Sequence, residues 1–267
     1  MSLLVKARHE GRDIVDVTPH SAGWKHVGFH AWRLKQGESA SMPTGERELC
    51  LVVLTGTVDM TIVANGSVHR YPDLGRRDSV FDNIAPAAVY VPPGHHVTVN
   101  ALRDAEVALC TAPGGSSRLP RVIDPATMPR SVRGEGSNTR YVRDILPQTQ
   151  PAEHLLVVEV VTPAGHSSSY PPHKHDRDAA PEETQLEETY YHRLNPPQGF
   201  AFQRVYTDDR SLDESMAVEN HDVVMVPRGY HPCVAPHGYD LYYLNVMAGP
   251  GRTWIFKNDP AHEWMLR

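Results

Sequence analysis

The sequence has few cysteines, no long apolar run and no block of charge of one sign. Its three cysteines, Cys50, Cys110 and Cys233, lie far apart and form no CxxC pair, so we interpret them as reduced thiols of a cytoplasmic protein. No apolar stretch approaches the roughly 20 residues that a membrane-spanning helix needs. The first residues also lack the apolar core of a signal peptide. We therefore expect no membrane partner.

The charge pattern argues against a nucleic-acid partner. The 267 residues carry a formal net charge of -6, and both signs are scattered along the chain without a basic block. Apolar residues make up 40% and charged residues 22%, which is ordinary for a globular protein. The length allows one large domain or two small ones.

Proline and histidine are the two residue types that stand out. The 23 prolines argue against long helices and favour many short strands. Short segments rich in β-branched and aromatic residues, bounded by Gly, Pro, Asn and Asp, support this interpretation. They are residues 49–54, 58–63, 88–91, 155–161, 201–207, 223–226 and 241–247. Their spacing predicts an all-β sandwich or barrel with few short helices.

Two features recur in the same order in the two halves of the chain. Glu48 heads a strand-like segment and is followed by the turn VPPGHH at 91–96; Glu187 heads another and is followed by VPRGYH at 226–231. This internal similarity suggests a duplication. The segment between the halves is rich in Gly, Ser, Pro and Arg, which is typical of a connector. We expect an N-terminal half at 1–112, a connector at 113–140 and a C-terminal half at 141–267.

The 16 histidines matter where they cluster, and the strongest cluster is His173-Lys-His175. Residues two apart on an extended strand point to the same face, so both imidazoles can reach one ion. His231 follows a tight turn and supplies a third imidazole. A glutamate completes the set, and alternation requires either Glu187 or Glu188 to face inward. Such a set leaves positions open for substrate, which is typical of a catalytic metal.

The order of these residues resembles the cupin superfamily, in which a histidine pair, a glutamate and a later histidine hold a metal in a β-barrel. The resemblance implies a bicupin with two related jelly-roll halves. On the usual spacing, Glu187 is our choice of ligand because it stands three residues before Tyr190, with Glu188 as the alternative. The first half lacks the histidine pair, so we expect it to be a degenerate copy and the chain to bind one metal ion. We expect its His95 and His96 to be structural or interfacial.

A closer resemblance covers nearly the whole chain. Several strings are similar to the 5-deoxy-glucuronate isomerase family of bacterial inositol catabolism. They are SSYPPHKHD, EETYYHR, GFAFQRVYT, VPRGYHP, YDLYYLNVMAGPGR and NDPAHEW. The resemblance implies a metal-dependent aldose–ketose isomerase that converts 5-deoxy-glucuronate to 5-dehydro-2-deoxy-gluconate in myo-inositol degradation. It also implies a small-molecule uronate as partner, and a homo-oligomer by analogy.

This reaction needs a group that moves hydrogen from C2 to C1 and a partner for the substrate carboxylate. As catalytic residues we expect Tyr190, His192 and Tyr242, with Tyr191 and Tyr243 as further candidates. For the carboxylate we expect Arg204 and Arg252. A proton transfer and a metal-assisted hydride shift both fit the sequence.

The sequence leaves open the identity of the metal and two alternatives to the isomerase function. We expect zinc or manganese, with iron, cobalt and nickel as alternatives. A cupin dioxygenase would use the same ligands with iron and oxygen. A non-catalytic sugar-binding bicupin would need no ligands, and the intact set argues against it.

Overall fold

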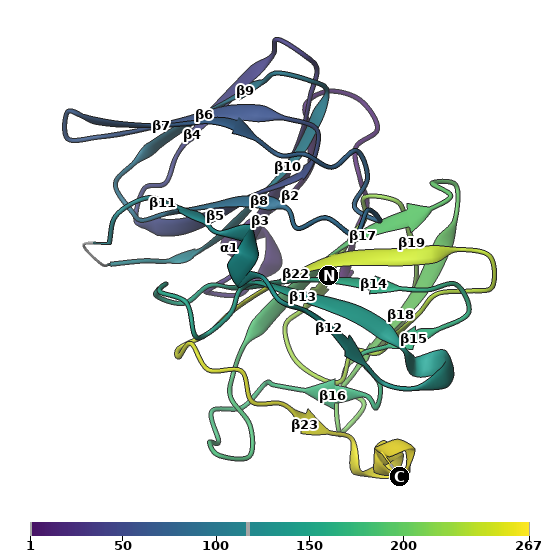
Figure 1. Cartoon of the computed structure of the whole chain (residues 1–267). Coiled ribbons are helices and arrows are strands. Elements are labelled where there is room, and N and C mark those ends of the chain that lie inside the picture. The colour runs from purple at the N-terminus through teal and green to yellow at the C-terminus, as the bar shows by residue number, and fades with distance from the viewer. Residues whose placement is uncertain (1, 116–117, 267) are drawn as a thin grey trace.

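Strands form nearly all of the regular structure in the computed structural model, which describes residues 2–115 and 118–266 (Figure 1). Helical segments are short. They are α1 (Pro19–Ala22), η1 (Pro125–Thr127), η2 (Gly136–Asn138) and η3 (Pro260–Leu266). The predicted all-β fold with few short helices is confirmed. No helix among the described residues is long and apolar enough to cross a membrane.

The N-terminal half, at the top of Figure 1, is a barrel of two sheets. The six-stranded sheet has the order β11 (Arg121–Ile123), β8 (Ala87–Val91), β5 (Arg47–Thr55), β10 (Ala105–Pro113), β3 (Gly28–Leu34), β2 (Asp13–Val17). The four-stranded sheet has the order β4 (Ser39–Pro43), β9 (His96–Ala101), β6 (Val58–Ala64), β7 (Ser67–Leu74). Apolar side chains such as Trp32, Leu51 and Met60 fill the space between them. This barrel therefore has an apolar core where the other half has a polar site.

The C-terminal half repeats this plan. Its seven-stranded sheet has the order β1 (Leu4–Val5), β20 (Val223–Val226), β17 (Glu187–Asn195), β22 (Asp240–Ala248), β14 (Leu156–Thr162), β13 (Arg140–Leu146), β12 (Arg130–Arg133). Its four-stranded sheet has the order β15 (Ser167–Ser168), β21 (Cys233–Val234), β18 (Phe200–Tyr206), β19 (Asp213–Glu219). A short pair, β16 (His173–Lys174) with β23 (Lys257–Asn258), completes this half.

The large sheets of the two halves pack against each other through an apolar core. Phe29 of β3 and Tyr191 of β17 lie across this contact with ring centroids 5.2 Å apart. Burial of such a side chain contributes about 1.5–3 kcal/mol. The N-terminal strand β1 crosses over and pairs with β20, so the C-terminal half includes a strand from the start of the chain.

Because of this packing, β17 and β22 are buried on both faces, while β18 is buried on one. In β18 the side chains of Ala201, Gln203 and Val205 are buried, and those of Phe202 and Arg204 are exposed. The alternation of burial therefore marks the inner face of β18, whereas β17 shows no such alternation.

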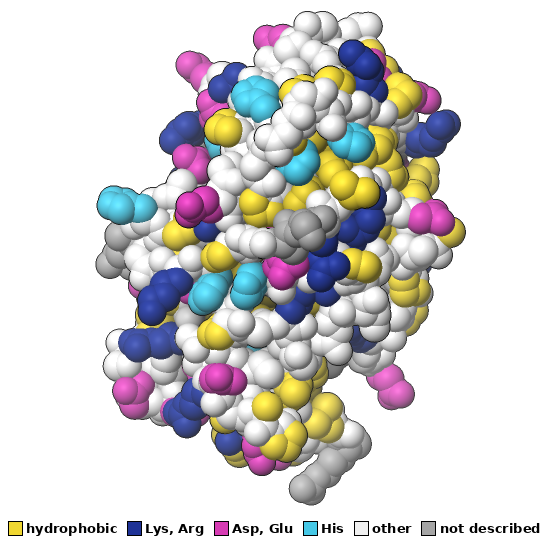
Figure 2. All heavy atoms as spheres, turned by 90° about the vertical axis from the view of Figure 1, so that its left-hand side faces the viewer, with side chains coloured by type: hydrophobic (Ala, Val, Ile, Leu, Met, Phe, Trp, Pro, Cys, Tyr) yellow, Lys and Arg dark blue, Asp and Glu magenta, His cyan; other side chains and the backbone are white. Residues whose placement is uncertain are grey.

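The segment that we expected to be a connector carries two strands. Strand β11 joins the N-terminal sheet through β8, and β12 joins the C-terminal sheet through β13. We keep as a proposal the division at 1–112, 113–140 and 141–267, with the connector contributing one strand to each half. On the face shown in Figure 2, side chains of both charges are interspersed and hydrophobic side chains form small groups.

Candidate metal centre

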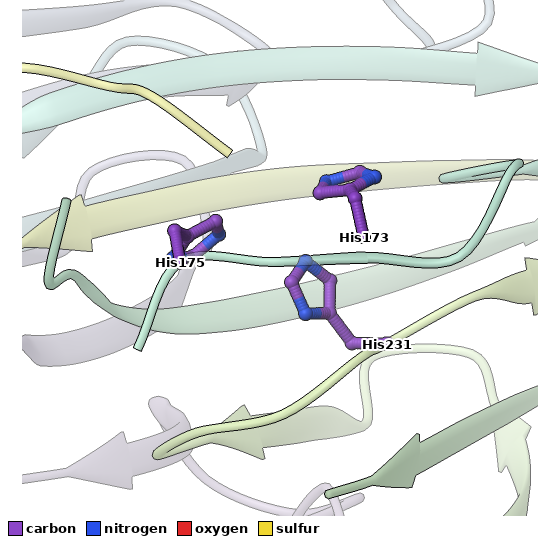
Figure 3. A group of neighbouring side chains, drawn as sticks. All are labelled: His173, His175 and His231. Atoms are coloured by element: carbon purple, nitrogen blue, oxygen red, sulfur yellow. The ribbon is translucent and has the colours of Figure 1, made fainter. Parts of the chain in front are cut away.

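Three histidines converge at one end of the C-terminal barrel (Figure 3). His173 lies on β16, His175 follows two residues later, and His231 follows the turn after β20. Their ligand nitrogens all lie within 4.8 Å of one another. The structure thus brings together the three histidines that the sequence singled out.

Backbone carbonyls orient two of these rings. The Nδ1 of His175 lies 3.1 Å from the carbonyl of Leu186, and the Nδ1 of His231 lies 2.9 Å from the carbonyl of Gly229. With Nδ1 as the donor, the lone pair of Nε2 is left for an ion. Gly229 has φ of 91°, and a Cβ there would lie 2.5 Å from the Tyr206 carbonyl. Only glycine fits this turn, so it fixes the direction of His231.

Glu188 faces two of the three histidines, His175 and His231. Its Oε2 lies 3.1 Å from Nε2 of His175 and 3.2 Å from Nε2 of His231. Its Oε1 accepts a hydrogen bond of 2.5 Å from the Asn245 side chain. The carboxylate is therefore held in place beside His175 and His231.

Glu187, our choice from the usual spacing, points to the opposite side of β17, so that choice is corrected in favour of Glu188. Its two carboxylate oxygens accept hydrogen bonds of 2.7–3.0 Å from the backbone N–H groups of Lys25, His26 and Val27. The physical reason is the strand alternation, which sends neighbouring side chains to opposite faces. The sequence left this choice open because both faces of β17 are buried.

The donor set fits a divalent cation. The Nε2 of His231 is fully buried and has no hydrogen-bond partner with good geometry, although Glu188 is close. Burial lowers the pKa of both His173 and His231 to about 3, so their imidazoles are neutral and can donate lone pairs. Burial also acts on His175, but the Glu188 carboxylate outweighs it and raises that pKa. Three imidazoles and one carboxylate suit zinc, manganese or iron.

A cavity of about 250 Å³ adjoins this group and is lined by His173 and Glu188. The phenols of Tyr190 and Tyr243 also line it, 3.1 Å from Ser169 Oγ and 2.5 Å from Ser168 Oγ respectively. Burial raises the pKa of Tyr190 and of Tyr243 well above the usual range of a tyrosine. Both phenols are therefore protonated and act as hydrogen-bond donors at neutral pH.

Two of the three expected catalytic side chains do not line this cavity. Tyr242 points to the other face of β22, where its hydroxyl donates to Glu159 over 3.1 Å; Tyr243 takes the inner position. His192 shares the face of Tyr190 but lies deeper, with Nε2 2.9 Å from Gln203 Oε1. Burial lowers its pKa to about 4. Of the three, only Tyr190 lines the cavity.

Both expected carboxylate partners lie away from the cavity and are corrected. Arg204 is on the exposed face of β18 and forms two hydrogen bonds of 2.7 and 2.8 Å with Asp213. Arg252 donates to backbone carbonyls of residues 146, 147, 148, 150 and 155. Arg133 and Arg140 line the cavity instead. The signal in the sequence was the arginine-rich stretch RSVRGEGSNTRYVR, which we had assigned mainly to the connector.

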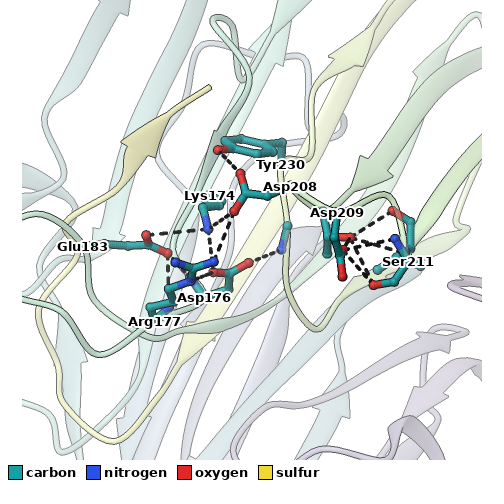
Figure 4. A network of polar contacts seen from close by, with 11 residues as sticks. Lys174, Asp176, Arg177, Glu183, Asp208, Asp209, Ser211 and Tyr230 are labelled. Atoms are coloured by element: carbon teal, nitrogen blue, oxygen red, sulfur yellow. Dashed lines mark hydrogen bonds and ion pairs between the residues drawn. The ribbon is translucent and has the colours of Figure 1, made fainter. Parts of the chain in front are cut away.

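A buried lysine links the two segments that carry the histidines (Figure 4). Lys174 donates to Asp176 over 3.1 Å and to Asp208 over 2.9 Å. Asp176 also accepts from the backbone N–H of Gly229 over 2.7 Å, and Tyr230 donates to Asp208. The sequence did not identify Lys174 as important because it points away from the neighbouring histidines.

Comparison with known proteins identifies the family. The chain matches the KduI/IolB family over residues 3–265. A 5-deoxy-glucuronate isomerase of Geobacillus kaustophilus is 50% identical over 269 residues, covering 100% of this chain and 96% of that protein. The enzyme of the same name from Bacillus subtilis strain 168 is 47% identical over 252 residues, covering 94% and 92%.

Solved structures agree with this assignment. The crystal structure of an IolB-like protein from Salmonella typhimurium LT2 has a TM-score of 0.96 and 49% identity, and the match covers 100% of both chains. Lactobacillus farciminis oxalate decarboxylase has a TM-score of 0.65 at 14% identity, covering 97% of this chain and 88% of that one. This distant likeness bears on the fold alone, and it confirms the bicupin architecture. The chain belongs to the KduI/IolB family.

Proposed function

We propose that this protein is a metal-dependent aldose–ketose isomerase that converts 5-deoxy-glucuronate to 5-dehydro-2-deoxy-gluconate in myo-inositol degradation. Relatives about half identical over nearly their full length carry the name 5-deoxy-glucuronate isomerase. The observation that carries the proposal is the buried group of three histidines and Glu188 beside a cavity of about 250 Å³. A cavity of this size suits a small polar molecule.

The metal ligands in this proposal are His173, His175, His231 and Glu188, holding one zinc or manganese ion. The buried neutral imidazoles and the unpartnered Nε2 of His231 support this assignment. When bound, such an ion supplies Lewis-acid polarisation of the substrate oxygens at C1 and C2.

The phenols of Tyr190 and Tyr243 hold the substrate in this proposal. Both are protonated, both line the cavity, and their ring centroids lie 4.9 Å apart. They can donate hydrogen bonds to substrate oxygens as negative charge develops there. The apolar side chains of Val142, Val158 and Val160 form part of the wall and exclude water from the reacting carbons.

The test is an assay of the purified protein with 5-deoxy-glucuronate, followed by NMR. We expect loss of the C1 aldehyde and hemiacetal signals and growth of a C2 ketone signal. Chelator treatment should abolish turnover, and zinc or manganese should restore it. His173→Ala should be inactive, whereas His96→Ala, an exposed histidine at the equivalent turn of the first half, should keep full activity.

Several outcomes would overturn the proposal. Full activity after removal of all metal would contradict the metal-dependent mechanism. Oxygen consumption by iron-loaded protein without isomerisation would favour a cupin dioxygenase, and binding without turnover would favour a non-catalytic bicupin. We also propose a cytoplasmic location, which the three free, buried cysteines support. The homo-oligomer stays a prediction.

A further inference from the structure

Two arginines lie directly opposite each other on neighbouring strands at the cavity. Arg133 of β12 and Arg140 of β13 are cross-strand partners in an antiparallel pair, so their side chains project to the same face. Both line the cavity that adjoins His173 and Glu188. Like charges in this arrangement destabilise a sheet unless something compensates for them.

No ion pair joins either arginine to a carboxylate within the part of the chain that the structure describes. Arg140 donates to the carbonyl and side chain of Asn138 and to the carbonyl of Tyr170, over 3.1–3.3 Å. The guanidinium of Arg133 lies over the Trp254 ring at 5.6 Å. Asp144 lies close enough to interact electrostatically with Arg133, but the two side chains are beyond ion-pair distance.

Two other arginines of this protein are matched by acids. Arg77 lies 2.9 Å from Glu159, and Arg193 lies 2.6 Å from Glu106. The cavity, in contrast, is lined by two guanidinium groups and one carboxylate, Glu188, which faces the histidines. An anionic ligand would compensate for this excess of positive charge.

Arg140 is also tied to the segment that carries the metal ligands. Its hydrogen bond to the carbonyl of Tyr170 anchors it three residues before His173. A ligand that reaches from the histidine group to the arginine pair therefore needs one end rich in carbonyl or hydroxyl oxygens and another that is anionic. A uronic acid in its open-chain form has both.

We propose that Arg133 and Arg140 form the subsite for the substrate carboxylate and make the enzyme select uronates over neutral aldoses. This inference rests on the proposed function, because it places C1 and C2 at the histidines and the carboxylate at the arginine pair. Guanidinium groups bind carboxylates through two parallel hydrogen bonds, which fixes the orientation of the substrate as well as its charge.

The test compares Arg133→Gln, Arg140→Gln and the double variant with Arg204→Gln as a matched control on the exposed face of β18. Each cavity variant should raise KM for 5-deoxy-glucuronate by about 10- to 100-fold with a smaller change in kcat. Activity on the neutral analogue 5-deoxy-glucose should be unchanged, so the preference for the uronate should fall. The control variant should behave as the wild type.

A second measurement separates this proposal from the isomerase proposal. Calorimetric titration with glucuronate should show binding at least tenfold weaker in the double variant, whether or not the wild type isomerises any substrate. Metal content and melting temperature, measured on each variant, show that the fold is intact. Equal binding of glucuronate by the wild type and a folded double variant would overturn the subsite, as would an unchanged preference for the uronate.

Discussion

Glu48 and Glu187 occupy equivalent positions in the two halves, and each accepts hydrogen bonds from three consecutive backbone N–H groups of the other half. Glu48 binds the N–H groups of residues 153–155 and Glu187 those of residues 25–27, over 2.6–3.0 Å. The repeated glutamate therefore joins the two halves. Glu188, which faces His175 and His231, has Leu49, a fully buried core residue, as its counterpart in the first half.

Substitution of these neighbours should separate stability from metal binding. Glu187→Gln should lower the free energy of unfolding by about 1–3 kcal/mol, because a buried carboxylate that accepts three N–H groups loses its charge and one acceptor. It should leave the metal bound. Glu188→Gln should reduce activity by more than the roughly 10- to 100-fold typical of residues that contact a metal ligand. Urea unfolding and metal analysis of both variants check this.

Glu48→Gln serves as the control, since it makes the same type of contact far from the cavity. It should match Glu187→Gln in stability and the wild type in metal content. Loss of metal from Glu187→Gln, together with retention in Glu188→Gln, would show that our correction of the ligand is wrong.

Short segments rich in β-branched and aromatic residues were enough to predict the all-β fold, and His231 was singled out by the turn before it. The period of two predicted that His173 and His175 share a face. It was insufficient for β17, because both faces of this strand are buried and polarity does not reveal the inner one. The same holds for Tyr242 and Tyr243, which are neighbours with opposite directions. Which residue of each neighbouring pair faces the barrel interior depends on how the sheets pack together, and this packing is a property of the whole fold.

The pairing of neighbouring strands was the second limit. Arg133 and Arg140 meet across a hairpin whose first strand lies in an apparent connector, so their proximity follows from the pairing of β12 with β13. The alternation in β18 left both directions open for Arg204, and its pairing with Asp213 on the neighbouring strand accounts for the outward direction.

Asp176 should control metal affinity although it does not face the histidine group. It connects Lys174 to the Gly229 turn, and that turn orients His231. Asp176→Asn should weaken metal binding by about 10- to 100-fold, as is typical of groups that orient metal ligands. Competition with a chelator measures the affinity.

The matched control is Asp209→Asn, since Asp209 lies in the same region and bonds only to its own loop at Thr207 and Ser211 (Figure 4). We expect its metal affinity to equal that of the wild type. Equal affinities in both variants would mean that the Gly229 turn holds its geometry without Asp176.

Glu106 should make the protein sensitive to acid. Burial alone would raise its pKa, but the Arg193 guanidinium, with His221 and the Tyr191 hydroxyl, outweighs burial and lowers the pKa to about 2. Because the folded pKa lies below the ordinary value of 4.5, this carboxylate stabilises the fold above pH 4.5. That contribution, about 3 kcal/mol, is lost as the pH falls toward 2.

Urea unfolding at several pH values between 7 and 3 measures this loss. Glu106→Gln should be less stable at pH 7 and should show a shallower decline below pH 4.5. A variant that declines as steeply as the wild type would assign the acid sensitivity to other carboxylates.

Hydrogen should move from C2 to C1 of the substrate without exchange with solvent. Among the described residues that line the cavity, Glu188 is the only carboxylate, and it is held by Asn245 beside two histidines. Tyr190 and Tyr243 are protonated and cannot accept a proton at neutral pH. His173, the remaining lining side chain with a basic nitrogen, is a metal ligand in our proposal. The cavity walls thus offer no base outside the ligand set, which favours transfer of the C2 hydrogen with its electron pair directly to C1, while the C2 hydroxyl proton passes to O1.

Isomerisation in D2O, followed by mass spectrometry of the product, tests this directly. We expect little deuterium at C1 in D2O, and substrate deuterated at C2 should give product deuterated at C1 in ordinary water. Product incubated in D2O without protein corrects for uncatalysed exchange. Full incorporation of solvent deuterium would instead show that a base at the cavity carries the proton, and would contradict direct transfer.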